Sequence, residues 1–187
     1  MTSLRKEAET RYTGYRDSVY HVTYESWRSQ VNRPDVDLRL YSIEDDALQQ
    51  CEQLWTIFPR QSHPPTFPWR EILNFERRTP RRFELAIWNG SLLCGLVIGR
   101  ASRSNIGPES NVTITLLQGA PPEINLLKGY IAPIAIDAAL AYATILGRPM
   151  VYVKDPLPAV MNYYQEFDFK VAKRRCKGLY LGRQTQD

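Results

Sequence analysis

Stretches of alternating apolar and polar residues run through the middle of the chain, and this alternation is the pattern of β-strands. Two of them flank Asn89-Gly90, and an Asn-Gly pair between apolar runs predicts a two-residue hairpin turn. Another run follows a polar break, and an earlier one precedes the first predicted helix. The strands predicted in this way cover residues 38–42, 83–88, 92–102 and 111–118.

Apolar residues recur every three or four positions elsewhere, which predicts helices over residues 43–55 and 69–78. A loop separates these two helices, because residues 59–68 hold four of the thirteen prolines. A third helix, over residues 129–146, is apolar on nearly every side, with Asp137 as the only charged residue between its ends. This helix must therefore be covered by other elements on most sides.

The start of the third helix is fixed by Pro133. Proline has no N–H group, so a helix tolerates it without losing a bond only in the first turn. We therefore predict Gly129 as the N-cap and Gly147 as the residue after the last turn. Such a helix end suits a pyrophosphate, although it is equally the ordinary entrance to a buried helix. The groups expected to face an anion are the N–H groups of Tyr130, Ile131 and Ala132 and the charge of Lys128.

Residues 149–153 (PMVYV) predict a buried strand that returns after this helix, so the two form a crossover unit. A short aromatic helix is expected at residues 159–167, and a last hairpin at residues 170–173 and 178–182. The order of elements predicts an α/β (α+β) domain with a mixed, mostly antiparallel central sheet flanked by helices.

The aromatic helix carries Tyr163 and Tyr164 side by side, so one side chain can face the core while the other faces a cleft. A phenol that faces a cleft can donate a proton to a leaving thiolate. Two packed aromatic side chains are the alternative interpretation.

Residues 1–36 are polar but rich in aromatic side chains, which makes them too aromatic for a disordered tail and too poor in aliphatic residues for a core of their own. We expect an N-terminal arm that docks on the domain of residues 37–187 or on a partner protein. The aromatic residues of the arm are Tyr12, Tyr15, Tyr20, Tyr24 and Trp27.

Composition narrows the class of protein. The 187 residues are enough for one substantial core, and the absence of a long apolar run or a secretory leader predicts a cytoplasmic protein without a membrane span. Two histidines leave little material for a metal site or a Ser-His-Asp triad, so no metal is expected. The three cysteines, Cys51, Cys94 and Cys176, lack metal-binding spacing and are expected to be free thiols.

The net charge of +4 permits anionic partners without requiring them. Two basic clusters, at residues 77–82 and 173–177, predict either solvated surface charge or contacts with phosphate groups. Direct binding of nucleic acid through these clusters is one of the functions that the sequence leaves open.

Residues 127–131 (LKGYI) resemble the strand-to-helix junction with which GNAT enzymes hold the coenzyme A pyrophosphate. Residues 164–169 (YQEFDF) resemble the family's Tyr-x-x-x-Gly-Phe pattern, with Asp168 in place of the glycine. Together with the order of elements, over residues 37–183, these segments resemble a divergent member of the GNAT superfamily of N-acetyltransferases.

This resemblance implies a GNAT-like fold, acetyl-CoA as cosubstrate, and transfer of an acetyl group to an amine by direct attack. It implies Tyr164 as the general acid. The residues it implies for coenzyme A binding are Leu116 and Leu117, beside the pantetheine arm, and Lys128, Gly129, Tyr130, Ile131 and Ala132, at the phosphates.

The junction departs from the family pattern at both ends. The family reads Arg or Gln, two residues, Gly, one residue, then Gly or Ala, whereas this chain has Leu126 and Ile131 at the outer places. A β-branched side chain at Ile131 is expected to hinder the close approach of a phosphate to the backbone.

The acceptor stays open among a protein, a small molecule and a charged tRNA, and the basic clusters favour an anionic macromolecule. Partner binding through residues 1–36 and oligomerisation also stay open. No general base is singled out, although Glu84, Glu123 and Asp155 are near the predicted cleft in element order. The alternative function is a non-catalytic GNAT-like binding or structural protein, for example in a phage particle or in a host-directed role.

Overall fold

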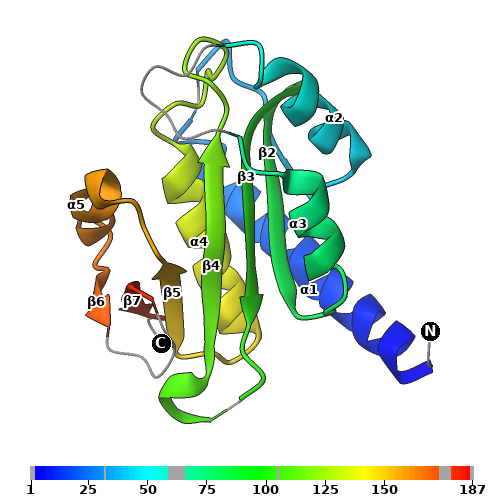
Figure 1. Ribbon diagram of the computed structural model, residues 1–187, viewed down its shortest axis with the longest axis vertical. Helices are drawn as coiled ribbons and strands as arrows, with labels where there is room; N and C mark the ends of the chain where they lie inside the picture. Colours follow the sequence, from blue (N-terminus) through cyan, green and yellow to red (C-terminus); the bar gives the residue numbers. More distant parts are fainter. Residues whose placement is uncertain (1–2, 32, 59–65, 105, 173–177, 186–187) are drawn as a thin grey trace.

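The computed structural model describes residues 3–31, 33–58, 66–104, 106–172 and 178–185. In these ranges seven strands form one sheet in the order β1-β2-β3-β4-β5-β7-β6, with helices on both faces (Figure 1). The strands are β1 (Leu38–Tyr41), β2 (Arg82–Asn89), β3 (Leu92–Ala101), β4 (Asn111–Gly119), β5 (Met150–Lys154), β6 (Lys170–Ala172) and β7 (Tyr180–Gln184). The helices are α1 (Ser3–Trp27), α2 (Asp45–Leu54), α3 (Trp69–Glu76), α4 (Ile131–Ile145) and α5 (Met161–Gln165), with short 3-10 helices η1 (Gly107–Glu109) and η2 (Pro158–Val160).

The mixed, mostly antiparallel sheet predicted from the sequence is confirmed. Neighbouring strands are antiparallel except β4 and β5, which run parallel and are joined through α4. The hairpin between β2 and β3 turns one residue later than predicted, because Asn89 still pairs with Leu92 and the loop is Gly90-Ser91. Gly90 has a φ of 57°, a left-handed conformation that glycine adopts at little cost. The turn of the last hairpin, residues 173–177, lies outside the described residues.

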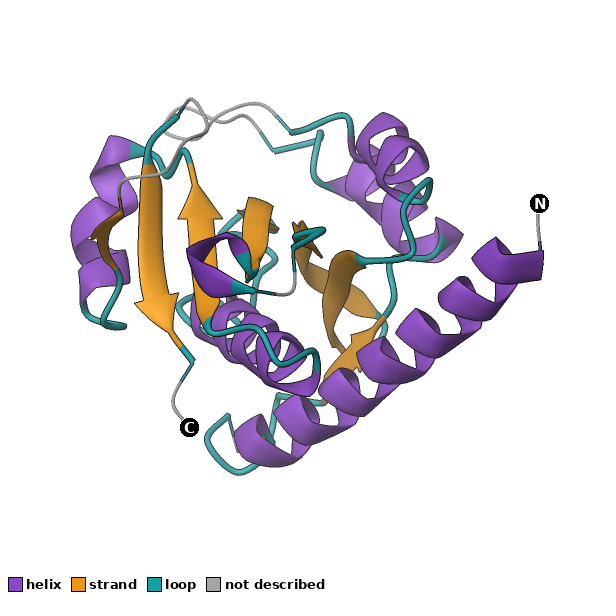
Figure 2. Cartoon of the chain, turned by 90° about the horizontal axis from the view of Figure 1, so that it is seen from below, coloured by secondary structure: helices purple, strands orange, loops and turns teal. Residues whose placement is uncertain are grey.

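The helices cover the sheet as two layers. Helices α1 and α4 pack side by side on one face, and α2 and α3 cover the other face (Figure 2). The buried side chains accordingly form two clusters, one on each side of the central strands. No helix in the described part of the chain is both long and apolar enough to cross a membrane.

Residues 3–27, predicted as part of an aromatic arm, form the 25-residue helix α1 and pack on the protein's own domain. Its buried residues follow a helical spacing along one side of the helix. This side has little hydrophobic contrast with the rest of α1, so the sequence pattern does not reveal the helix. The buried residues are Arg16, Val19, Tyr20, Thr23 and Trp27.

Beneath α1, two arginines share two carboxylates. Arg16 Nε and Arg82 Nε lie 3.8 Å and 2.8 Å from Glu84 Oε1, and Glu9 Oε1 lies 3.0 Å from Arg16 Nη2 and 2.7 Å from Arg82 Nη1. The Tyr20 hydroxyl donates a 2.6 Å hydrogen bond to the carbonyl oxygen of Glu84. Each buried charge thus has an opposite partner, which a buried charge requires, and α1 is tied to β2.

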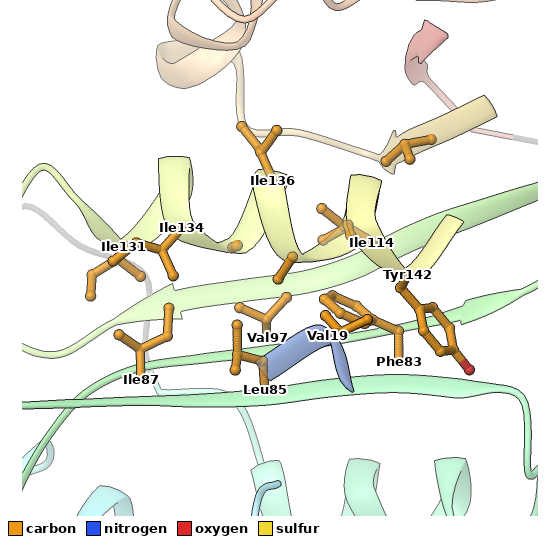
Figure 3. Close-up of a cluster of buried hydrophobic side chains, with 14 of the residues drawn as sticks. Val19, Phe83, Leu85, Ile87, Val97, Ile114, Ile131, Ile134, Ile136 and Tyr142 are labelled. Carbon is orange, nitrogen blue, oxygen red and sulfur yellow. The ribbon is translucent and has the colours of Figure 1, made fainter. Parts of the chain in front are cut away.

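Helix α4 is buried on the face of the sheet that α1 also covers, as its apolar sequence predicts. Figure 3 shows Ile131 and Ile134 directed from α4 towards the sheet, where Ile87 and Leu85 of β2 lie. The helix ends as predicted at Gly147, which has a φ of 61°. The N–H of the next residue, Arg148, bonds to the carbonyl oxygen of Ala143 at 2.8 Å, and this pattern is a Schellman motif.

Candidate active site

Strand β4 leaves β5 halfway along its length. The two strands pair only from Asn111↔Met150 to Ile114↔Val153, while β4 stays paired with β3 up to Gly119. Between Ile114 and Leu116 the pairing with β3 skips Thr115, so Thr115 is the extra residue of a β-bulge. The remaining edge of β4, residues 115–119, therefore has no strand beside it on the β5 side among the residues that the structure describes.

Gly99 makes the bulge sterically feasible. A Cβ atom at Gly99 would lie 2.2 Å from the carbonyl oxygen of Thr113. This clash is with a backbone atom, so a change of side-chain conformation could not remove it. The hydroxyl of Thr115 donates a 3.0 Å hydrogen bond to the carbonyl oxygen of Ile98 and fixes the bulge from its other side. A glycine inside an apolar strand pattern is the sequence signal that could have revealed this site.

The gap between β4 and β5 is a cleft of about 900 Å³. Its walls come from β4, the first turn of α4, the segment from β5 to α5, and α3 with the residues before it. Of the residues predicted for coenzyme A and catalysis, Leu116, Leu117, Ala132 and Tyr164 line this cleft, whereas Lys128, Gly129, Tyr130 and Ile131 do not.

The first turn of α4 differs from the prediction. The N-cap is Tyr130 rather than Gly129, because the Tyr130 N–H bonds to the carbonyl oxygen of Leu127 at 2.9 Å in the preceding turn. The Tyr130 N–H is therefore not free for an anion. Pro133 is the third helical residue, where its missing donor costs nothing. Within the described residues no backbone carbonyl accepts from the N–H of Ile131 or Ala132.

The turn before α4 has open space around Gly129 and is fixed by the buried side chain of Asn125. Gly129 has a φ of 90°, and a Cβ atom there would meet nothing within 4 Å. Asn125, which the sequence analysis missed, is buried below it and accepts a hydrogen bond from the Leu127 N–H through Oδ1. Its Nδ2 donates to the carbonyl oxygen of Cys94 at 3.2 Å. An Asn that bonds to the backbone two residues on is a known turn signal.

Ile131 does not obstruct the turn, contrary to the expectation from its bulk. The side chain is 6% exposed and packs on Gly95 of β3, where an added Cβ atom would lie 2.6 Å from Ile131 Cγ2. The bulk that replaces the family's small residue is therefore accommodated by a glycine in the facing strand.

The C-terminal end of α1 contacts the first half of α4. The Trp27 ring lies edge-to-face with Tyr130 at 6.2 Å, and Trp27 Nε1 donates a 2.9 Å hydrogen bond to Asp137 Oδ2. Burial raises the pKa of Asp137, while the bond from Trp27 and the charge of Arg183 act in the opposite direction. The N-terminal helix thus touches the turn that leads into α4.

Tyr163 and Tyr164 of α5 both line the cleft, rather than one facing the cleft and the other the core, and their ring centroids lie 6.2 Å apart. The Tyr163 hydroxyl donates to the carbonyl oxygen of Gly129 at 3.4 Å. Tyr164 is 5% exposed and packs on Phe169, and burial raises its pKa to about 12. Its phenol therefore stays protonated at neutral pH and can act only as a proton donor there.

The three carboxylates placed near the cleft by element order separate in the structure. Glu84 lies under α1 in the arginine network, and Glu123 is exposed and does not line the cleft. Asp155 lines the cleft, and its Oδ1 accepts a 2.8 Å hydrogen bond from the Leu179 N–H. The sequence analysis missed Glu76, which lines the cleft from α3 and pairs with Arg100. Element order cannot identify such a pair, because it depends on the packing of α3 against β3.

The wall from α3 is anchored on β4 by Gln118. Its Oε1 accepts hydrogen bonds from Trp69 Nε1 at 2.8 Å and from the Phe67 N–H at 3.3 Å. The basic cluster before β2 serves packing as well: Arg77 donates to the carbonyl oxygen of Ile43, and Arg82 belongs to the network under α1. The second basic cluster, residues 173–177, lies outside the described residues.

Solved structures of acetyltransferases share the fold of this chain. The chain matches an acetyltransferase from Thermus thermophilus with a TM-score of 0.59 and 16% identity, over 80% of this chain and 98% of that one. It matches a GNAT-family acetyltransferase from Streptococcus pneumoniae with a TM-score of 0.54 and 11% identity, over 80% and 100%. The PaiA N-acetyltransferase from Thermoplasma acidophilum, solved in complex with coenzyme A, matches with a TM-score of 0.54 and 11% identity, over 79% and 99%.

The chain therefore has the fold of the GNAT acetyltransferases, as the sequence resemblance predicted. No protein-family model matches the sequence, and no curated protein matches it either. The fold of this chain is thus shared with solved structures, although its sequence has little similarity to theirs.

Proposed function

We propose that this protein transfers an acetyl group from acetyl-CoA to an amine by direct attack of the amine on the thioester. The observation that carries this proposal is the departure of β4 from β5 at the Thr115 bulge, which opens a cleft beside an unpaired strand edge and ends at the first turn of α4. The GNAT fold supports it, and one of the matched proteins is solved with coenzyme A.

The residues present fit a coenzyme A thioester. The edge of β4 offers backbone groups to the amides of a pantetheine arm, and Leu116 and Leu117 give this stretch an apolar surface. At the far end, the N–H groups of Ile131 and Ala132 and the α4 dipole favour the negative charge of a pyrophosphate. The φ of Gly129 and the open space around it let a phosphate approach the turn, with Lys128 beside it.

In this proposal Tyr164 is the general acid. The reaction breaks a C–S bond and leaves a thiolate, which takes the proton of the Tyr164 phenol as it departs. The phenol is un-ionised at neutral pH, as any tyrosine is, and burial moves its pKa further above that range. Water is largely kept from it, since the side chain is buried against Phe169.

The experiment is a titration of the full chain with acetyl-CoA, by calorimetry and by thermal unfolding. At 100 times the dissociation constant, a ligand adds about 2.7 kcal/mol to the free energy of unfolding, or about 5–10 °C in Tm for a chain of this size. Release of coenzyme A in the presence of an amine then tests transfer. No binding at millimolar acetyl-CoA would overturn the proposal, and binding without transfer to any amine would leave a non-catalytic acyl-CoA-binding protein.

A further inference from the structure

Glu76, the last residue of α3, is a buried carboxylate with one oxygen that lacks a donor. Its side chain lines the cleft and is 7% exposed. Glu76 Oε1 accepts a hydrogen bond from Arg100 Nη2, but no donor among the described residues reaches Oε2. A buried polar group without a partner costs about 1–3 kcal/mol, so a donor that enters here is favoured.

The Glu76–Arg100 pair lies at the closed end of the cleft. Arg100 pairs across β3–β4 with Thr113, one residue before Ile114 makes the last pair with β5. Side chains alternate between the faces of a strand, and Leu96 and Ile98 of β3 belong to the core on the α3 side. Arg100 therefore projects to the α3 side, at the level where β4 and β5 separate.

The charge of the cleft differs from that of the whole chain. Among the described residues that line it, three carboxylates, Glu71, Glu76 and Asp155, stand against two cations, Arg100 and Lys154, which gives these residues a net charge of −1. The chain as a whole carries +4. A cation is therefore favoured inside the cleft, whereas the basic clusters of the sequence favoured an anionic macromolecule as acceptor.

Apolar side chains of α3 also line the cleft. They are Ile72, which precedes Glu76 by one helical turn, and Phe75, which precedes it directly. Phe75 is 57% exposed, and its ring already has a cation over it, because Arg78 Cζ lies 5.6 Å from the ring centroid. This combination fits a cationic head carried beside an apolar or aromatic group.

We propose that Glu76 holds the acceptor, a primary alkylammonium ion borne next to an apolar group, and takes the proton that the amine must lose. This inference rests on the proposed function and names the substrate class of the same cleft. The ammonium supplies the donor that Oε2 lacks, while Arg100, whose side chain is 45% exposed, turns towards solvent.

The proton transfers balance. An N–H bond of the ammonium breaks and its proton goes to the Glu76 carboxylate, which later releases it to solvent. The neutral amine forms the C–N bond as the C–S bond breaks, and the thiolate takes a proton from Tyr164. The second N–H proton is lost from the product nitrogen as the amide forms, and it returns Tyr164 to its neutral state by way of solvent.

The test uses the full chain saturated with coenzyme A and titrated with 2-phenylethylamine by calorimetry. The anion 3-phenylpropionate, of similar shape but opposite charge, is the matched ligand. Glu76→Gln is expected to weaken binding of the amine at least tenfold without changing binding of coenzyme A. Glu52→Gln, which breaks an exposed ion pair with Arg70 outside the cleft, serves as the control and is expected to change neither affinity.

Arg100→Gln provides an independent test in case Glu76→Gln fails to fold. It removes the competing cation and is expected to raise the affinity for the amine several-fold. In turnover, Glu76→Gln is expected to lower kcat/KM for the amine at least tenfold.

The outcomes separate the two proposals. A chain that does not bind coenzyme A overturns the proposed function. A coenzyme A-loaded chain that ignores 2-phenylethylamine, prefers 3-phenylpropionate, or binds the amine equally well after Glu76→Gln overturns the assignment of Glu76 alone.

Discussion

Two of the walls of the cleft differ in the groups that they offer. One, which we call the backbone wall, consists of residues 115–119 of β4 and the first turn of α4. The other, the side-chain wall, consists of α3, the residues before it and Arg100. The backbone wall offers N–H and C=O groups and apolar surface, while the side-chain wall offers a carboxylate, a guanidinium and aromatic rings.

The two walls depend on the identity of their residues to different degrees. Backbone groups are the same for every residue except proline, so the backbone wall needs only the bulge, the open turn and the helix start. The side-chain wall depends on Glu76 and Arg100 themselves. We therefore expect the backbone wall to resemble that of structures at 11–16% identity and the side-chain wall to be particular to this chain.

The largest effect is expected from Tyr164→Phe, which removes a proton donor and leaves the backbone wall unchanged. Turnover should fall about 100-fold while the affinity for acetyl-CoA stays the same. The alkaline loss that an ordinary tyrosine causes near pH 10 should be absent in the native protein, since the pKa of Tyr164 is about 12. Steady-state kinetics and calorimetry measure both quantities, with Tyr163→Phe as control, and equal turnover in Tyr164→Phe would remove this residue from the mechanism.

Gly129→Asp tests the backbone wall directly. At a φ of 90° an L-residue is strained by about 1–2 kcal/mol, and the new carboxylate repels phosphates. Coenzyme A affinity should fall about tenfold or more, as measured by calorimetry. Gly107→Asp is the matched control, because Gly107 has a φ of 66°, meets equally open space and lies away from the cleft. Equal loss of affinity in both variants would show that the turn before α4 does not hold the ligand.

Asp168→Gly tests for backbone strain close to Tyr164, behind the cleft. Asp168 has a φ of 61°, in the place where the resembling family pattern has glycine. Glycine should relieve the strain and raise the free energy of unfolding by up to about 1 kcal/mol, while Asp168→Ala should lower it. Urea unfolding measures both, and a rise with alanine would contradict the assignment of strain.

The smallest effect is expected at Asp137 of α4, which Trp27 of α1 contacts next to the backbone wall. Since burial raises the pKa of Asp137, folding favours its protonated form, so this contribution to stability is complete below the unfolded pKa and is lost as the pH rises through the folded pKa. Asp137→Asn keeps an acceptor for Trp27 and should raise the urea midpoint at pH 7 but not at pH 3. The exposed Asp17→Asn serves as control, and an equal change at both pH values would show that the charge of Asp137 is not responsible.

Local patterns were enough to predict most of the fold. The strands around the β2–β3 hairpin, helix α4 and its end at Gly147 follow from alternation, apolar periodicity and glycine, because each depends on residues close in sequence. Helix α1 could not be predicted in the same way. Its inner side is formed by residues such as Arg16 and Tyr20, whose burial depends on partners about 65 positions away.

The residues of the candidate site also form two groups, those that the sequence indicated and those that only the structure revealed. The resemblance to the GNAT family implied Leu116, Leu117, Ala132 and Tyr164 for one site, and these four residues line the cleft. Only the tertiary structure decided that Ile131 turns away onto Gly95, that Tyr130 closes a turn, and that Glu76 meets Arg100. These features depend on how α3 and α4 pack on β3, and the period of a sequence pattern carries no information about contacts between elements.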